Sequence, residues 1–153
     1  MSDGTPLRLY IDTNILIYVV EGTQPFGSQL TCLLDALDDG TVRGVTSELT
    51  IAEVMVKPLA SKQQLYIQEY QRLLSNDSLL ELRPVDRAVL ERSASLRADL
   101  GGKLVDGVHV ATADLADCKF FLSQDAKIKV PPGIALIDSH QVAAVLAKNQ
   151  APS

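Results

Sequence analysis

The sequence is poor in the residues that mark specialised classes of protein. Its 153 residues include two cysteines, two histidines and no tryptophan. Cys32 and Cys118 are far apart in the sequence, lie among apolar residues and show no CxxC spacing. These features exclude a disulfide framework and give no support to a zinc site, so we expect both thiols to lie in the core.

Long hydrophobic runs are also missing. The longest, residues 15–20, is far shorter than the roughly 20 residues that cross a bilayer. The first residues carry no basic, apolar signal pattern. We therefore expect a cytoplasmic protein with no membrane partner. A content of 46% hydrophobic and 22% charged residues is typical of one compact domain, which we expect over residues 1–148 with a loose tail over 149–153.

The chain also lacks an excess of positive charge. The chain has 14 Lys and Arg residues against 19 Asp and Glu residues, a net charge of −5. Proteins that bind nucleic acids normally present a basic surface to the phosphates. If this chain binds a nucleic acid, positive charge must reach the site from another source.

Short apolar runs alternate with stretches of helical periodicity along the whole chain. Five strand-like runs are expected, at residues 7–11, 42–46, 79–85, 119–123 and 134–137. The stretches between them have apolar residues at helical spacing, and the last run is followed by a helix that we expect to open at Ser139. Pro58 is expected to interrupt or end the helix that follows the second strand. Strands separated by helices predict an α/β three-layer sandwich, with a parallel sheet and helices on both faces.

Four acidic residues interrupt otherwise apolar segments. Asp12 lies at the end of the first strand, Glu53 within the helix after the second, Asp106 in the first turn of a later helix, and Asp125 just past the fourth strand. Ligands of open parallel sheets collect at the carboxyl ends of the strands, where the strand order reverses. A single acid of this set is explained equally well as a helix cap or a solvated residue. One shared site explains the four together better.

Four carboxylates in one crevice would repel one another. The repulsion is about 1 kcal/mol per pair at 4 Å in water and about 4 kcal/mol at an effective dielectric constant of 20. A divalent cation relieves it, and a site made only of carboxylate oxygens suits Mg²⁺ or Mn²⁺ better than zinc. Setting these four aside from the 19 acidic residues leaves 15 against 14 basic ones, a net charge of −1. A bound cation would therefore also remove the electrostatic objection to a nucleic acid.

Four motifs surround these acids: Asp12-Thr-Asn14, Ser47-Glu-Leu-Thr-Ile-Ala-Glu53 followed by Pro58, Asp106-Gly-Val-His-Val-Ala-Thr-Ala113, and Phe121-Leu-Ser-Gln-Asp125. Together they resemble the motifs of the PIN domain family, and within it the VapC-type toxins. The resemblance extends from residue 7 to about residue 140. Two departures are mild: Gly107 stands where a helix former is expected, and Ser123-Gln124-Asp125 replaces a common Thr-Asn-Asp.

The resemblance implies a five-stranded parallel sheet and a metal-dependent endoribonuclease in which Asp12, Glu53, Asp106 and Asp125 bind Mg²⁺ or Mn²⁺. It also implies RNA as the substrate, a homodimer, and a small cognate antitoxin as a partner. The reaction would be phosphodiester hydrolysis by a metal-activated water, which needs no protein nucleophile. A catalytically silent PIN-like module that binds nucleic acid or protein is the alternative. A phosphatase is disfavoured because its usual Asp-x-Asp motif would need an acid in place of Asn14.

Polar and basic neighbours complete the expected site. Thr13, Asn14 and Ser123 are candidates to orient the carboxylates by hydrogen bonds, although Asn14 serves equally well at the start of a helix. His109 is expected to be a core histidine with its nitrogens satisfied rather than a proton carrier. The candidate RNA contacts are Arg43, Lys57, Lys103 and Lys127, most of which a solvated surface would explain as well.

Overall fold

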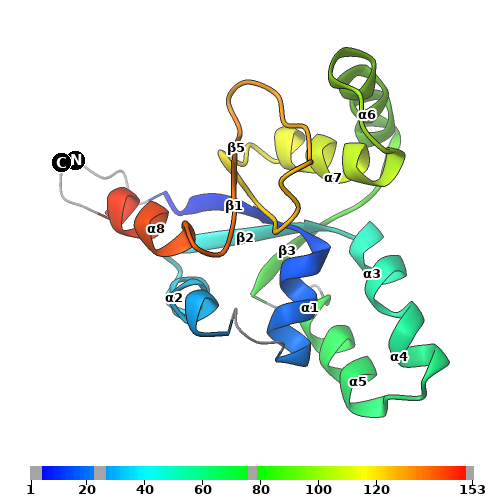
Figure 1. Ribbon diagram of the computed structural model, residues 1–153, viewed down its shortest axis with the longest axis vertical. Helices are drawn as coiled ribbons and strands as arrows, with labels where there is room; N and C mark the ends of the chain where they lie inside the picture. The colour runs from blue at the N-terminus through cyan, green and yellow to red at the C-terminus, as the bar shows by residue number, and fades with distance from the viewer. Residues whose placement is uncertain (1–4, 23–26, 76–78, 151–153) are drawn as a thin grey trace.

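The computed structural model describes residues 5–22, 27–75 and 79–150. Five parallel strands form one sheet in the order β3-β2-β1-β4-β5, which confirms the predicted fold class (Figure 1). The strands are β1 (Leu7–Ile11), β2 (Val42–Ser47), β3 (Leu80–Arg83), β4 (Phe120–Leu122) and β5 (Ala135–Ile137).

Helices cover both faces of this sheet. Helices α6 and α7 pack on one face, whereas α1, α2, α5 and α8 pack on the other (Figure 1). The helices are α1 (Thr13–Glu21), α2 (Gly27–Asp38), α3 (Leu49–Val54), α4 (Val56–Ala60), α5 (Gln64–Leu73), α6 (Arg87–Leu100), α7 (Leu104–Leu115) and α8 (Val142–Gln150). Among the described residues, none of these helices is long and apolar enough to span a membrane.

The central strand β1 contributes to both cores because side chains alternate between the faces of a sheet. Leu9 and Ile11 belong to the core under α1, α2, α5 and α8, while Tyr10 belongs to the core under α6 and α7. Tyr10 is fully buried and stacks on Phe121 of β4, with ring centroids 4.8 Å apart. The strand therefore connects the site at its carboxyl end to both layers of helices.

The helix after β2 breaks earlier than the sequence predicts. We expected Pro58 to interrupt or end it, but the break between α3 and α4 lies at Met55, and Pro58 is a buried residue within the first turn of α4. The first turn of a helix tolerates proline because its N–H groups have no partner inside the helix. The prediction of a break was right in kind and wrong in position.

The closing helix is displaced along the chain relative to its prediction. Ser139 does not open it: its N–H donates to Gln124 Oε1 at 2.8 Å, and its hydroxyl donates to Gln29 Oε1 at 2.7 Å. These bonds tie Ser139 into the loop before α8, which begins at Val142. The helix extends to Gln150, beyond the expected start of the loose tail, and residues 151–153 of that tail lie outside the described part of the chain.

The strand order reverses next to β1. Strands β2 and β3 extend the sheet on one side of β1, and β4 and β5 extend it on the other. The N–H of Asp12, just past β1, donates to the carbonyl of Leu122 at the end of β4 at 3.0 Å. The switch point of the sheet is therefore at Asp12, where open α/β sheets bind their ligands.

Candidate active site

Asp12 is a buried carboxylate held entirely by neutral donors. It caps α1 in an extended conformation, and its Oδ1 accepts from the N–H of Thr13 at 2.9 Å. Its Oδ2 accepts from the hydroxyl of Ser123 at 2.7 Å and from the amide of Asn14 at 3.3 Å. The residue is 7% exposed, and no basic side chain of the described residues forms an ion pair with it. Burial raises the pKa of Asp12, and His109 and the Ser123 hydrogen bond lower it only in part.

Asn14 and Ser123 join the ends of β1 and β4. The Asn14 amide donates to Ser123 Oγ at 3.0 Å, and its Oδ1 accepts from the N–H of Gln124 at 3.1 Å. The N–H of Asp125 donates to Ser123 Oγ at 3.1 Å. Asn14 was predicted either to orient a carboxylate or to serve the start of a helix; its amide lies 3.3 Å from Oδ2 of Asp12, and its side chain also contacts the loop after β4.

Glu53 reaches the same place from α3. Its Oε1 accepts from the Thr13 hydroxyl at 2.8 Å and lies 2.5 Å from Nε2 of His109. The side chain is 31% exposed. Burial alone would raise the pKa of Glu53, but its hydrogen bond and electrostatic interaction with His109, with the Thr13 hydrogen bond, lower it below its ordinary value. Thr13 thus donates a side-chain hydrogen bond to Glu53, whereas Asn14 and Ser123 donate to Asp12.

His109 is buried with both ring nitrogens in hydrogen bonds, as the sequence led us to expect. It is 2% exposed, and its Nδ1 lies 2.6 Å from the hydroxyl of Tyr10. The sequence did not predict that one of these partners is Glu53, a candidate metal ligand. The other partner is Tyr10 of β1. No local sequence signal pairs residues this far apart, although an inward-facing histidine one turn after Asp106 is a clue that a site is near.

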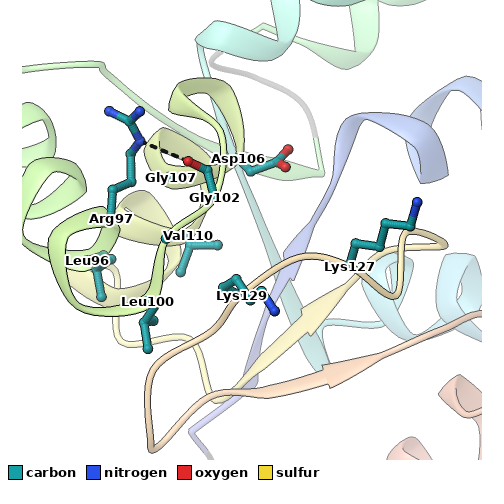
Figure 2. A pocket seen from close by; sticks show the side chains of 10 residues that line it. Leu96, Arg97, Leu100, Gly102, Asp106, Gly107, Val110, Lys127 and Lys129 are labelled. Atoms are coloured by element: carbon teal, nitrogen blue, oxygen red, sulfur yellow. Dashed lines mark hydrogen bonds between the residues drawn. The ribbon is translucent and has the colours of Figure 1, made fainter.

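Asp106 lies in the first turn of α7 and lines a small pocket together with Lys127 (Figure 2). Among the described residues its side chain has no hydrogen bond or ion pair. Asp125 is exposed, and its Oδ1 accepts from the N–H of Lys127 at 2.9 Å, as in a local turn. Neither acid contacts Asp12 or Glu53 directly, so hydrogen bonds bring together two of the four predicted carboxylates.

Gly107 allows α6 and α7 to approach each other closely beside Asp106. A Cβ atom on Gly107 would lie 2.7 Å from Cδ of Arg97 and 3.0 Å from Oγ of the buried Ser93. Arg97 crosses this position and donates from Nε to the carbonyl of Gly102 at 3.3 Å (Figure 2). The departure from a helix former at residue 107 therefore has a packing reason.

The four candidate RNA contacts separate into two groups. Lys127 lines the pocket beside Asp106, Lys103 is the exposed residue before α7, and Lys57 is exposed on α4. Arg43 is the second residue of β2, and its Nε lies 3.6 Å from Oε1 of Glu81. It is thus at the amino half of the sheet, away from Asp12, and we no longer count it as an RNA contact. Arg97 and Lys129 line the Asp106 pocket as well, and Arg97 was not anticipated.

The donor set suits a hard divalent cation better than a soft one. Its candidate ligands are carboxylate oxygens, and in the part of the chain that the structure describes no ion pair compensates the charge of the buried Asp12. Within the described residues, however, no three His, Cys, Asp or Glu side chains lie close enough together to enclose a metal ion as they stand. A cation shared by these acids requires at least one side chain, such as that of Asp106, to turn toward Asp12.

The fold and site define an α/β protein with acidic groups at the carboxyl ends of its central strands. The PIN domain matches residues 9–133, and the chain belongs to this family, whose members are generally nucleases. No curated protein matches the chain.

Several solved structures are similar to the chain over most of their own length. A chain of a toxin–antitoxin complex from Klebsiella pneumoniae has 26% identity and a TM-score of 0.63, and the match covers 83% of this chain and 95% of that one. VapBC2 from Rickettsia felis, bound to a DNA fragment from its promoter, has 16% identity and a TM-score of 0.63, with coverage of 86% and 98%. DNA-bound VapBC from Salmonella typhimurium has 20% identity and a TM-score of 0.62, with coverage of 87% and 98%. The last two likenesses establish a common fold.

Proposed function

We propose that the chain is a Mg²⁺- or Mn²⁺-dependent endoribonuclease, the toxin of a toxin–antitoxin pair. The observation that carries the proposal is Asp12, a buried carboxylate at the switch point with hydrogen-bond donors but no basic partner among the described residues. Such a group is costly in a folded protein unless a cation compensates it. Membership of a nuclease family and the nearby acids Glu53, Asp106 and Asp125 support the same reading.

The four acids would hold the cation, which when bound polarises the scissile phosphate and lowers the pKa of a water molecule. The chain's own residues keep the carboxylates in place. Ser123 and Asn14 fix Oδ2 of Asp12, and Thr13 fixes Oε1 of Glu53. Hydrogen bonds to first-sphere carboxylates commonly control metal affinity and activity.

Basic residues beside Asp106 would bind the phosphates of an RNA strand. Lys127 and Lys129 line the same pocket as Asp106, and Lys103 is exposed one turn before it. Lys57 is exposed on α4, which follows the helix that carries Glu53. Phosphate contacts of this kind position a strand without reading its sequence. RNA rather than DNA is inferred from the family resemblance.

A small antitoxin is the proposed protein partner, and a homodimer is the proposed assembly. The antitoxin is supported by the similar structures, which are described as toxin–antitoxin complexes, two of them with bound DNA. In this scheme the antitoxin silences the nuclease, so the chain alone is the active form.

The proposal is tested by incubating the purified chain with an RNA pool that includes structured tRNA and ribosomal fragments. Parallel reactions contain Mg²⁺, Mn²⁺ or EDTA, and single-stranded DNA replaces RNA in one series. We expect metal-dependent RNA fragments that disappear with Asp106→Asn. The matched control is Asp99→Asn, which removes an exposed acid of α6 and should cleave like the wild type.

The alternative of a catalytically silent binding module is favoured by one observation, the absence of three metal-holding side chains in close contact within the described residues. The same experiment separates the two functions. RNA that is retained by the chain but left intact under all metal conditions would support the binding module. Cleavage that persists in EDTA or in Asp106→Asn would contradict the proposed nuclease site.

A further inference from the structure

A chain of buried hydrogen bonds links the sheet to the candidate ligand Glu53. The Tyr10 hydroxyl lies 2.6 Å from Nδ1 of His109, and Nε2 of His109 lies 2.5 Å from Oε1 of Glu53. Thr13 donates to the same oxygen and lies 3.4 Å from Nε2. Tyr10 is fully buried and His109 is 2% exposed, so contacts within the protein fix the orientation of the His109 ring.

The direction of these hydrogen bonds follows from the chemistry of their partners. An ionised carboxylate only accepts hydrogen bonds, so Nε2 of His109 must carry the proton that it shares with Glu53. In the neutral ring Nδ1 then has a lone pair, which accepts the hydroxyl proton of Tyr10. Tyr10 therefore selects the tautomer that donates to Glu53.

The two carboxylate oxygens of Glu53 differ in their hydrogen bonds. Oε1 accepts both hydrogen bonds, whereas Oε2 has no hydrogen-bond partner among the described residues. A glutamate on a short helix with a side chain 31% exposed would otherwise sample several rotamers. Two buried donors on one oxygen restrict the carboxylate and leave the other oxygen available to a ligand.

We propose that His109, held in its tautomer by Tyr10, is a positioning residue that orients Glu53 so that Oε2 binds a divalent cation. The role rests on the proposed metal-dependent function and adds to it a residue that acts through Glu53 without touching the metal. Hydrogen bonds to a metal ligand typically change metal affinity by about 10–100-fold when they are removed. The same loss is expected here.

Two amide substitutions separate this role from a purely structural one. In His109→Gln the amide nitrogen takes the place of Nε2 and still donates to Glu53. In His109→Asn the amide group takes the place of Nδ1 and still contacts Tyr10, but it does not reach Glu53. We expect His109→Asn to weaken Mn²⁺ binding, measured by electron paramagnetic resonance of free Mn²⁺, by about 10-fold or more, and His109→Gln to bind within a few-fold of the wild type.

Three further variants make the comparison specific. Thr112→Val is the matched control, since Thr112 is buried one turn later on α7 and its hydroxyl bonds, among the described residues, only to the carbonyl of Val108. In a Glu53→Gln background, adding His109→Asn should cause no further loss of Mn²⁺ affinity, because the two changes act on one group. Tyr10→Phe should lower Mn²⁺ affinity several-fold. This variant tests the positioning role if His109→Asn does not fold.

The outcomes distinguish this inference from the proposed function. Equal Mn²⁺ affinities of His109→Asn and His109→Gln, or a further loss in the Glu53→Gln background, would overturn the positioning role while leaving the metal site intact. A wild-type chain that binds no Mn²⁺ and cleaves no RNA would overturn both. Affinities that merely follow the melting temperatures of the variants would assign His109 to the core alone.

Discussion

Neutralising Asp12 should stabilise the protein while removing its proposed activity. In Asp12→Asn the side-chain oxygen still accepts from the N–H of Thr13, and asparagine caps a helix about as well as aspartate. The Ser123 hydroxyl, a donor to Asp12, cannot accept from the new amide, because its oxygen already accepts from the Asn14 amide and the N–H of Asp125, so its hydrogen bond to Oδ2 is lost. The amide of Asn14, 3.3 Å from Oδ2, loses one of its two acceptors and keeps Ser123 Oγ, and each lost hydrogen bond costs about 0.5–1.5 kcal/mol.

The gain is the relief of a buried charge without a cationic partner, an effect of several kcal/mol per ion in protein interiors. We expect a net stabilisation of about 1 kcal/mol at pH 7 without metal. For a chain of this size that corresponds to a rise in melting temperature of about 2–4 °C. Differential scanning fluorimetry in EDTA measures it.

The pH dependence of this difference tests the reasoning itself. Because the pKa of Asp12 is raised above 3.8 in the folded protein, the unfolded chain ionises at a lower pH than the folded one. Wild-type stability relative to Asp12→Asn should therefore fall as the pH rises from about 4 through the folded pKa, and then level off. Below the ordinary aspartate pKa the difference should be smallest. A variant that is less stable at pH 7, or a difference independent of pH, would refute the account of Asp12.

Two other predictions concern the metal and the core. Mn²⁺ at 100 times its Kd should stabilise the wild type by about 2.7 kcal/mol, a rise in melting temperature of about 5–10 °C, and no rise in the wild type would contradict the metal site. Gly44→Ala should destabilise by about 1–3 kcal/mol in urea unfolding, because its Cβ would lie 2.7 Å from Leu80 Cδ2 and 2.9 Å from Leu37 Cδ2 in a packed core. A melting curve unchanged by Gly44→Ala would show that these side chains move aside without cost.

The sequence determines much of the fold because its strongest signals are local. Gly22, in the left-handed conformation, ends α1, and Asp86 caps α6 by accepting from the N–H of Val89 at 3.0 Å. Each of these depends on residues within one or two turns. The break at Met55 rather than Pro58 was missed because a proline is equally acceptable inside the first turn of a second helix.

The candidate site is only partly predictable for the opposite reason. The neighbouring positions of Asp12 and Ser123 follow from the pairing of β1 with β4, but the contacts of Tyr10, Glu53 and His109 join segments far apart in the chain. Arg43 was misplaced because a basic residue carries no sign of its ion pair, here with Glu81 across the sheet. Periodicity specifies which face a side chain takes, whereas the partner on that face comes from tertiary packing.

The carboxylates of Asp12 and Glu53 lie in contrasting environments, and this contrast bears on the negative charge of the chain. Glu53 is kept ionised by His109 and Thr13, while Asp12 is buried with neutral donors only, so that its charge is the less well compensated. A divalent cation would interact most favourably with Asp12, whose buried charge is the less well compensated, and Glu53 beside it is already ionised and held by two hydrogen bonds. Glu53 is thus kept ionised by its neighbours, whereas the charge of Asp12 is poorly compensated. In the proposed function, binding of a cation would supply, at the switch point, the positive charge for phosphate that a chain with a net charge of −5 otherwise lacks.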